Sequence, residues 1–219
     1  MKDIILETKD LCKSFKRPGG TQMVLNKMNL QIYKNKMTAI RGKSGNGKST
    51  LLNILAATMM ADSGEVLYGD IDLQKLSNAE RARYRREKVG YIPQNLYLLD
   101  DRNVFMNIAL PLQYSGEKKE RIRKKVEEVA KWFDIKDLLG KLPQTLSRGE
   151  KQRVAICRSI VKIPEILFAD EPTASCIYTQ KENKKIRKPL AADQTAFIFA
   201  RLAAARLFSI NSIRRLCWS

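Results

Sequence analysis

A glycine-rich segment early in the chain has the residue types that bind phosphate groups. Residues 42–49 read GKSGNGKS and match the pattern G-x-x-x-x-G-K-[ST] at every fixed position. Glycine lets the backbone turn tightly enough for its N–H groups to surround phosphate oxygens, and the start of a following helix adds a partial positive charge. Lys48 would reach the terminal phosphates, and the Ser49 hydroxyl would ligate Mg²⁺. We expect nucleotide contacts from these residues: Gly42, Lys43, Ser44, Gly45, Asn46, Gly47, Lys48, Ser49 and Thr50.

Two carboxylates follow an apolar run later in the chain. Residues 166–169 read ILFA, and Asp170 and Glu171 come directly after them. A buried strand would deliver both acids to the carboxyl edge of a sheet, where open α/β folds bind phosphates. There Asp170 would hold Mg²⁺, directly or through water, and Glu171 would polarise the attacking water. An acidic pair alone is a weak signal, but together with the phosphate-binding segment it predicts a nucleotide-hydrolysing site.

A third polar segment, LSRGE at residues 146–150, stands at an expected helix start. The Ser147 hydroxyl and the free N–H groups of the first helical turn would form a second anion site. The same residues also fit an ordinary helix cap, in which Ser147 caps the helix and Glu150 completes a capping box. Sequence physics alone favours the cap.

The elements that would position these residues follow from apolar periodicity and turn residues. A Pro-Gly-Gly turn joins the first two strands, which predicts an antiparallel N-terminal β part. Strands then alternate with helices, as is typical of an α/β fold with a mostly parallel sheet. We expect strands at 4–15, 24–33, 37–41, 65–68, 89–92 and 165–169, helices at 48–58 and 78–88, and a further helix that follows LSRGE and ends at 161. The stretch 95–147 reads as an inserted helical subdomain with apolar residues at helical spacing.

These elements predict four parts of the chain. Residues 1–94 form the first part of a nucleotide-binding core, 95–147 the helical subdomain, and 148–174 the second part of the core. Residues 175–219 form a basic tail without a recognisable core pattern.

Composition excludes several other classes of protein. The 219 residues are 44% hydrophobic and 29% charged, ordinary values for a globular chain. No stretch approaches the roughly 20 apolar residues of a membrane span, and no signal-peptide pattern begins the chain, so we expect a cytoplasmic protein. The sequence has no histidine, which excludes His-dependent triads and His-ligated metals, and its four cysteines fit no zinc pattern. The net charge of +18 indicates polyanionic partners.

Four motifs in a fixed order resemble the nucleotide-binding subunit of ATP-binding cassette (ABC) transporters. They are GKSGNGKST at 42–50, YIPQ at 91–94, LSRGEKQRVAICRSIV at 146–161 and ILFADEPT at 166–173. The resemblance covers about residues 4–174 and is strongest to the lipoprotein-release, macrolide-export and cell-division group, within which antimicrobial-peptide exporters are the most similar. It implies a P-loop NTPase core, ATP and Mg²⁺, and two subunits, identical or different, that bind head to tail. It also implies separate transmembrane permease subunits, with this chain peripheral on the inner face of the cell membrane.

The resemblance also assigns roles to single residues. Gln94 occupies the position that senses Mg²⁺ and the γ-phosphate, so it is a candidate catalytic and metal-binding residue. Ser147 and Gly149 would contact the γ-phosphate of the ATP held by the opposite subunit. Phe15 occupies the place of the aromatic residue that stacks on adenine, the alternative being a core or hairpin phenylalanine.

The chain departs from the family at several positions. Arg148 replaces the first glycine of the usual LSGGQ, a change that we expect the site to tolerate. After Thr173 the family has roughly S-x-L-D, whose aspartate orients the dimer interface, and this aspartate is missing here. Further on, the family has a strand ending in T-H-D, whose histidine contacts the γ-phosphate, and this sequence has no histidine. Residues 195–200 (TAFIFA) fit that strand, but Arg201 follows it.

A reading-frame shift near Ser175 and Cys176 explains the tail better than a genuine tail that binds a membrane surface through its arginines and leucines. Because the histidine that contacts the γ-phosphate is missing, we expect ATP binding with weak or no hydrolysis. The alternatives to an active exporter ATPase are a hydrolysis-deficient regulatory or structural subunit and the truncated product of a damaged gene. A nucleic-acid-binding ATPase is disfavoured, because such members of the superfamily usually carry two cassettes or long insertions, so no nucleic-acid partner is expected.

Overall fold

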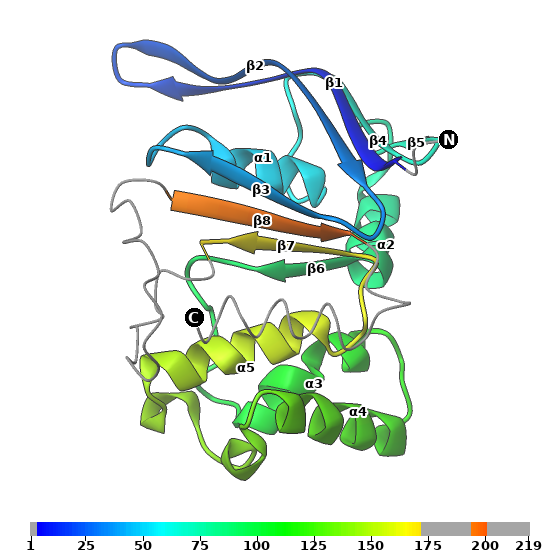
Figure 1. Cartoon of the computed structure of the whole chain (residues 1–219), viewed down its shortest axis with the longest axis vertical. Coiled ribbons are helices and arrows are strands. Elements are labelled where there is room, and N and C mark those ends of the chain that lie inside the picture. Colours follow the sequence, from blue (N-terminus) through cyan, green and yellow to red (C-terminus); the bar gives the residue numbers. More distant parts are fainter. Residues whose placement is uncertain (1–3, 172–193, 201–219) are drawn as a thin grey trace, which may run out of the picture.

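The computed structural model describes residues 4–171 and 194–200, and the predictions for the tail beyond Glu171, apart from the strand at 195–200, lie outside the described residues. Two four-stranded sheets and five α-helices make up this part of the chain (Figure 1). None of its helices is both long enough and apolar enough to cross a membrane.

The first sheet is antiparallel and contains the N-terminal hairpin. Its strands follow the order β2-β1-β4-β5. Their bounds are Ile4–Arg17 for β1, Gly20–Tyr33 for β2, Ser63–Tyr68 for β4 and Ile71–Asp72 for β5. The predicted antiparallel pair is confirmed, with Arg17 opposite Gly20 across the turn.

The second sheet has the order β3-β8-β7-β6. Its strands are β3 (Met37–Gly42), β8 (Gln194–Ala200), β7 (Ile166–Asp170) and β6 (Val89–Ile92). β6 and β7 are parallel, and β8 is antiparallel to both β3 and β7. Three of the four strands therefore point the same way, so that β3 and β7 end at one edge.

The strand expected at 195–200 is present, but it runs against its neighbours. Its end, Ala200, exchanges backbone hydrogen bonds with Asn35 and Lys36 just before β3, at distances of 3.0 and 3.2 Å. The resemblance implied that this strand would lead towards the phosphates. In the structure its end lies at the opposite edge of the sheet, which corrects that expectation.

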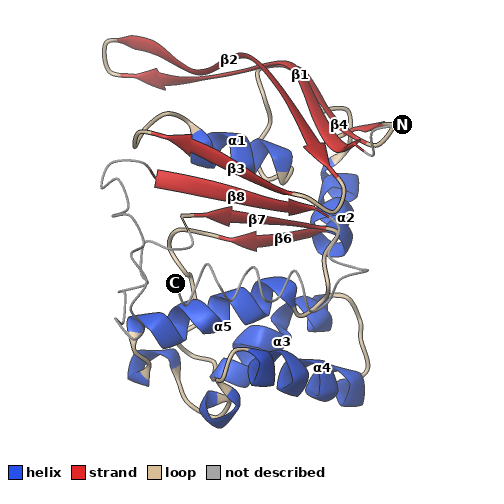
Figure 2. Cartoon of the chain, viewed as in Figure 1, coloured by secondary structure: helices blue, strands red, loops and turns tan. Residues whose placement is uncertain are grey.

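Strand β7 separates two apolar cores because all of its residues are buried. Leu167 and Ala169 pack with α3, α4 and α5, whereas Ile166 and Phe168 pack with α1 and the first sheet. This division follows from the alternation of side chains along a strand. Figure 2 shows the resulting layers, with α1 between the two sheets and α3 to α5 beyond the second sheet.

The helices agree with the predicted ones except in the inserted segment and at one end. They are α1 (Lys48–Leu55), α2 (Asn78–Lys88), α3 (Val104–Tyr114), α4 (Lys119–Trp132) and α5 (Arg148–Ile160), with short 3₁₀ turns at Lys136–Leu138 and Pro143–Thr145. α1 is shorter than predicted. The stripe of apolar residues on α4 is buried as expected, at Ile122, Val126 and Val129.

Residues 95–103 are not helical, although the whole stretch 95–147 was expected to be. The fully buried Asn107 accepts a hydrogen bond from the Leu99 amide at 2.8 Å. Its side-chain amide donates to the carbonyls of Leu99, Arg102 and Asn103. One side chain thus satisfies the backbone groups of this loop, which removes the need for helical hydrogen bonds.

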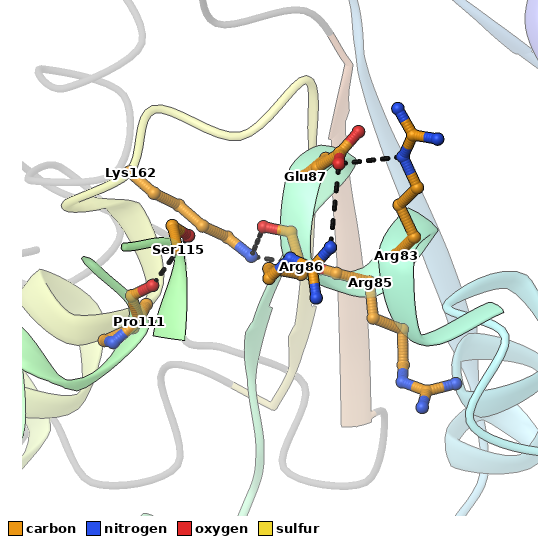
Figure 3. A network of polar contacts seen from close by, with 7 residues as sticks. All are labelled: Arg83, Arg85, Arg86, Glu87, Pro111, Ser115 and Lys162. Atoms are coloured by element: carbon orange, nitrogen blue, oxygen red, sulfur yellow. Dashed lines mark hydrogen bonds and ion pairs between the residues drawn. The ribbon is translucent and has the colours of Figure 1, made fainter. Parts of the chain in front are cut away.

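Lys162, just after α5, binds the C-terminal end of α2 (Figure 3). Its ammonium donates to the carbonyls of Arg85 and Arg86, both at 2.8 Å. These carbonyls lie in the last turn of α2, where the helix dipole favours a cation. Burial and, second, the charge of Arg86 lower the pKa of Lys162 to about 8.

Gly90 in β6 is required because two segments approach its backbone closely. A Cβ atom there would lie 2.6 Å from the carbonyl oxygen of Ser159 and 2.8 Å from Leu167 and Pro164. We expect Gly90→Ala to lower the free energy of unfolding by about 1–3 kcal/mol, as overpacking does in cores. Urea denaturation measures this.

Gly140→Ala is the matched control, because a Cβ atom at Gly140 meets nothing within 4 Å. Its effect should stay within about 0.5 kcal/mol. If the two alanine variants unfold at the same urea concentration, the close approach at Gly90 does not constrain the fold.

Candidate functional site

The phosphate-binding loop lies between the end of β3 and the start of α1, as its sequence predicts. Gly45 and Gly47 have φ angles of +82° and +78°, in the left-handed region that favours glycine. At Gly47 a Cβ atom would lie 2.5 Å from the side chain of Val24 in β2. Glycine at this position therefore permits both the turn and the approach of the hairpin.

Lys48 is held across this loop. Its ammonium donates to the carbonyls of Gly42 at 2.8 Å and Lys43 at 2.9 Å, and the residue is only 7% exposed. Helix α1 begins at Lys48, and the partial positive charge of its N-terminus adds to that of the ammonium. Together they form a concentrated positive site of the kind that binds phosphate.

A cavity of about 270 Å³ adjoins the loop. It brings together most of the predicted site residues, namely Phe15, Ser44, Gly45, Gly47, Lys48, Ser49, Thr50, Gln94 and Glu171. Arg17 and Val24 of the hairpin also line it and were not predicted. The alternation of residues along β1, which places Arg17 on the same side as Phe15, is the only sequence signal for Arg17.

Four predicted residues lie around the loop without lining the cavity. Gly42 and Lys43 contribute the carbonyls that hold Lys48. The side chain of Asn46 lies over Gly42, 3.6 Å from where a Cβ atom would stand. Asp170 lies at the end of β7.

Asp170 has the properties of a metal ligand. It is 4% exposed, and its Oδ1 atom has no hydrogen-bond partner among the described residues. A buried carboxylate oxygen without a partner is unfavourable unless a cation or water satisfies it. Mg²⁺ prefers oxygen ligands such as carboxylates and hydroxyls, so Asp170 and the Ser49 hydroxyl fit this ion chemically.

Glu171 and Gln94, the two predicted catalytic residues, are in contact although they are far apart in the sequence. The side-chain amide of Gln94 donates to Oε2 of Glu171 at 2.8 Å. The backbone of Glu171 has a φ of +49°, which turns the chain sharply after β7. Burial raises the pKa of Glu171, the charge of Asp170 raises it further, and Lys48 opposes both.

Helix α5 holds the backbone on both sides of Gln94. The guanidinium of Arg158 donates to the carbonyls of Leu96 at 2.6 Å and Tyr97 at 2.8 Å. The hydroxyl of Ser159 donates to the carbonyl of Tyr91 at 2.6 Å. No local pattern identifies these two residues as supports of the site, because their partners are about 60 positions away along the chain.

Ser147 and Gly149 do not line the cavity. Ser147 caps α5 by accepting a hydrogen bond from the Glu150 amide, and Glu150 accepts one from the Ser147 amide at 2.7 Å. The capping box favoured by the sequence is thus confirmed. Ser147 and Arg148 are exposed, and a Cβ atom at Gly149 would meet open space.

Comparison with known proteins gives consistent similarities. Residues 25–174 match the family described as ABC transporter. The lipoprotein-releasing system ATP-binding protein LolD of Buchnera aphidicola (subspecies Schizaphis graminum) is 41% identical over 184 residues, which cover 84% of this chain and 79% of that protein. LolD of Colwellia psychrerythraea is 35% identical over 196 residues, 89% of this chain and 76% of that protein.

Solved structures of ABC cassettes are also similar to this chain. A dimeric ATP-binding cassette in a post-hydrolysis state, bound to ADP and Pi, superposes with a TM-score of 0.70 at 29% identity. That match covers 78% of this chain and 75% of the other. CbiO1 of Clostridium perfringens, part of an ABC transporter complex, superposes with a TM-score of 0.68 at 30% identity over 79% of this chain and 67% of that one.

Proposed function

Because this chain belongs to the ABC transporter family, we propose that it is the MgATP-binding subunit of an exporter that releases lipoproteins. The relatives named for lipoprotein release support this substrate class over peptides and drugs. One observation carries the proposal: Gln94 and Glu171 contact each other in the same cavity as Phe15 and Lys48. In this cavity the adenine would contact Phe15, the phosphates Lys48, and the attacking water Glu171.

Each residue of the cavity has a proposed task. The N–H groups of the loop and the ammonium of Lys48 bind the phosphates, and Phe15 stacks on the adenine. Ser49, Gln94 and Asp170 would hold Mg²⁺, which neutralises charge on the phosphate oxygens when bound. Glu171 accepts the proton of the attacking water, and its raised pKa brings it closer to the pH at which a general base works.

We further propose that two such subunits, identical or different, pair head to tail on the inner face of the membrane and act with a separate permease. Ser147 and Gly149 lie away from the cavity of their own subunit, at an exposed helix start. There they can reach the γ-phosphate held by a second subunit, with Arg148 beside them as a further cation. The dimeric solved cassette supports this arrangement.

The proposed division of the chain follows the same logic. The nucleotide-binding core comprises residues 1–94 and 148–174, and the helical subdomain comprises 95–147. α5 joins the two parts, because it shares an apolar core with α3 and α4 while it supports the backbone around Gln94.

The second candidate is a hydrolysis-deficient ATP-binding subunit, which includes the product of a damaged gene. The reversed direction of β8 and the lack of histidine in the sequence favour it, because no imidazole can contact the γ-phosphate. Glu171, by contrast, is in place with Gln94 as its partner. Loss of one such contact costs on the order of 10²–10³ in rate, so we propose ATP binding with slow turnover.

Titration calorimetry of the purified chain with MgATP tests the proposed function. We expect saturable binding of MgATP and weaker binding of ATP when EDTA removes the metal. Phosphate release, measured in parallel, should be slow or absent. A folded chain that does not bind MgATP would contradict the assignment, and a turnover of several per second would contradict the predicted deficiency.

A further inference from the structure

The end of β1 that carries Phe15 pairs with one neighbouring strand, whereas the rest of β1 pairs with two. β1 pairs with β4 only as far as Cys12, which faces Ser63, whereas its pairing with β2 continues to Arg17. The segment 13–17 therefore has a strand partner on one side only. Phe15, which lines the cavity, lies in the middle of this segment.

Asp62, the residue just before β4, makes hydrogen bonds to the part of β1 near which the pairing with β4 ends. Its Oδ2 atom accepts hydrogen bonds from the amide and the hydroxyl of Ser14, both at 2.7 Å. Its Oδ1 atom accepts one from the ammonium of Lys13 at 2.6 Å. The amide of Asp62 itself donates to the carbonyl of Cys12 at 2.9 Å. One residue thus holds three consecutive residues of β1.

The bonds to Lys13 and Ser14 also favour the ionised form of the Asp62 carboxylate. The hydrogen bond from Lys13 and then those from Ser14 lower the pKa of Asp62 to about 2. The turn that carries Asp62 is also closely seated on β1, since a Cβ atom at Gly64 would lie 2.5 Å from the carbonyl oxygen of Asp10. The position of the carboxylate is therefore well defined although its side chain is 40% exposed.

The effect of Asp62 extends to the ring of Phe15. The ammonium of Lys13, held by Asp62, lies 5.6 Å from the centre of that ring, within the range of a cation–π contact. Asp62 thus holds both a cation that contacts the Phe15 ring and the backbone residue next to Phe15.

We propose that Asp62 is a positioning residue for nucleobase binding, which holds segment 13–15 so that the Phe15 ring is fixed at the nucleotide cavity. Asp62 does not line that cavity, so it acts through Lys13, Ser14 and Phe15. The proposal rests on the proposed nucleotide site. It assigns Asp62 to affinity for the base and not to affinity for the phosphates.

Two ligands that differ only by the nucleoside separate these effects: MgATP and magnesium tripolyphosphate. Asp62→Ala should weaken MgATP binding about fivefold, since base–aromatic stacking itself contributes on the order of tenfold or more. Binding of tripolyphosphate should change less than about twofold, because the loop and Lys48 are untouched. Asp62→Asn keeps an acceptor for the Ser14 amide but no charge for Lys13, so its loss should be intermediate.

Phe15→Ala and the double variant complete the experiment. Phe15→Ala should weaken MgATP binding by about tenfold or more. Adding Asp62→Ala should weaken it little further, since both substitutions act through the Phe15 ring. Asp70→Ala, in the exposed turn between β4 and β5, is the matched control and should bind both ligands as the unmodified chain does.

The outcomes distinguish this proposal from the proposed function. If Asp62→Ala weakens both ligands equally, Asp62 supports the fold in general and the positioning role is wrong. If Phe15→Ala weakens MgATP alone but Asp62→Ala changes nothing, the nucleotide site stands and the positioning role is again wrong. If the unmodified chain binds MgATP no better than tripolyphosphate, the base site itself fails, and the role of Asp62 fails with it.

Discussion

Replacing Lys48 with alanine is expected to weaken MgATP binding by roughly 10–10²-fold. The ammonium is nearly buried inside the loop, where two backbone carbonyls hold it ready for a phosphate. Each charge-assisted hydrogen bond that it would donate contributes about 1.5–3 kcal/mol. Two of its three N–H groups donate to the carbonyls, so one bond to a phosphate is lost, which corresponds to a roughly 10–10²-fold larger dissociation constant. Calorimetry with MgATP, and with tripolyphosphate for comparison, measures this loss.

The loss at Lys48 should apply to both ligands, because the ammonium is expected to contact phosphate and not base. Lys75→Ala is the control for charge alone: its ammonium pairs with Asp72 on the exposed surface and should leave binding unchanged. Thermal unfolding of both variants checks that the fold is retained. Retention of near-normal MgATP affinity by a folded Lys48→Ala variant would remove the phosphate site from the proposed function.

Replacing Glu171 with glutamine should separate binding from hydrolysis. The amide keeps the shape of the side chain but cannot accept a proton, and a positioned general base contributes about 10²–10⁴-fold to rate. Whatever turnover the chain has should fall by that factor. MgATP should at the same time bind more tightly, by about fivefold, because one negative charge beside the phosphates is gone. Glu127→Gln, on the exposed face of α4, is the matched control.

The pH dependence gives this second prediction a sign. Burial and the charge of Asp170 raise the pKa of Glu171, so its carboxylate becomes protonated at a higher pH than an ordinary glutamate. As the pH falls through that value, turnover should fall, and the MgATP affinity of the unmodified chain should rise towards that of Glu171→Gln. The MgATP affinity of Glu171→Gln should lack this rise at low pH. Equal pH profiles for the two proteins would show that Glu171 does not titrate beside the nucleotide.

Features that depend on neighbouring residues were predictable from the sequence alone. The phosphate loop is one, because its glycines, Lys48 and Ser49 are contiguous and carry their own backbone requirements. The capping box at Ser147 and the buried stripe of α4 are others, since both arise within one or two helical turns. The antiparallel hairpin followed in the same way from a turn of glycine and proline between alternating strands.

The tertiary structure alone decided the rest, because those features join residues that the chain keeps apart. Alternation of side chains is the same in either direction along a strand, so it could not reveal that β8 runs against β3 and β7. The contact between Gln94 and Glu171, the support from Arg158 and the hold of Asp62 on Ser14 depend on which elements become neighbours. Packing of the two sheets and the helices sets these neighbours, and no pattern within a few residues encodes it.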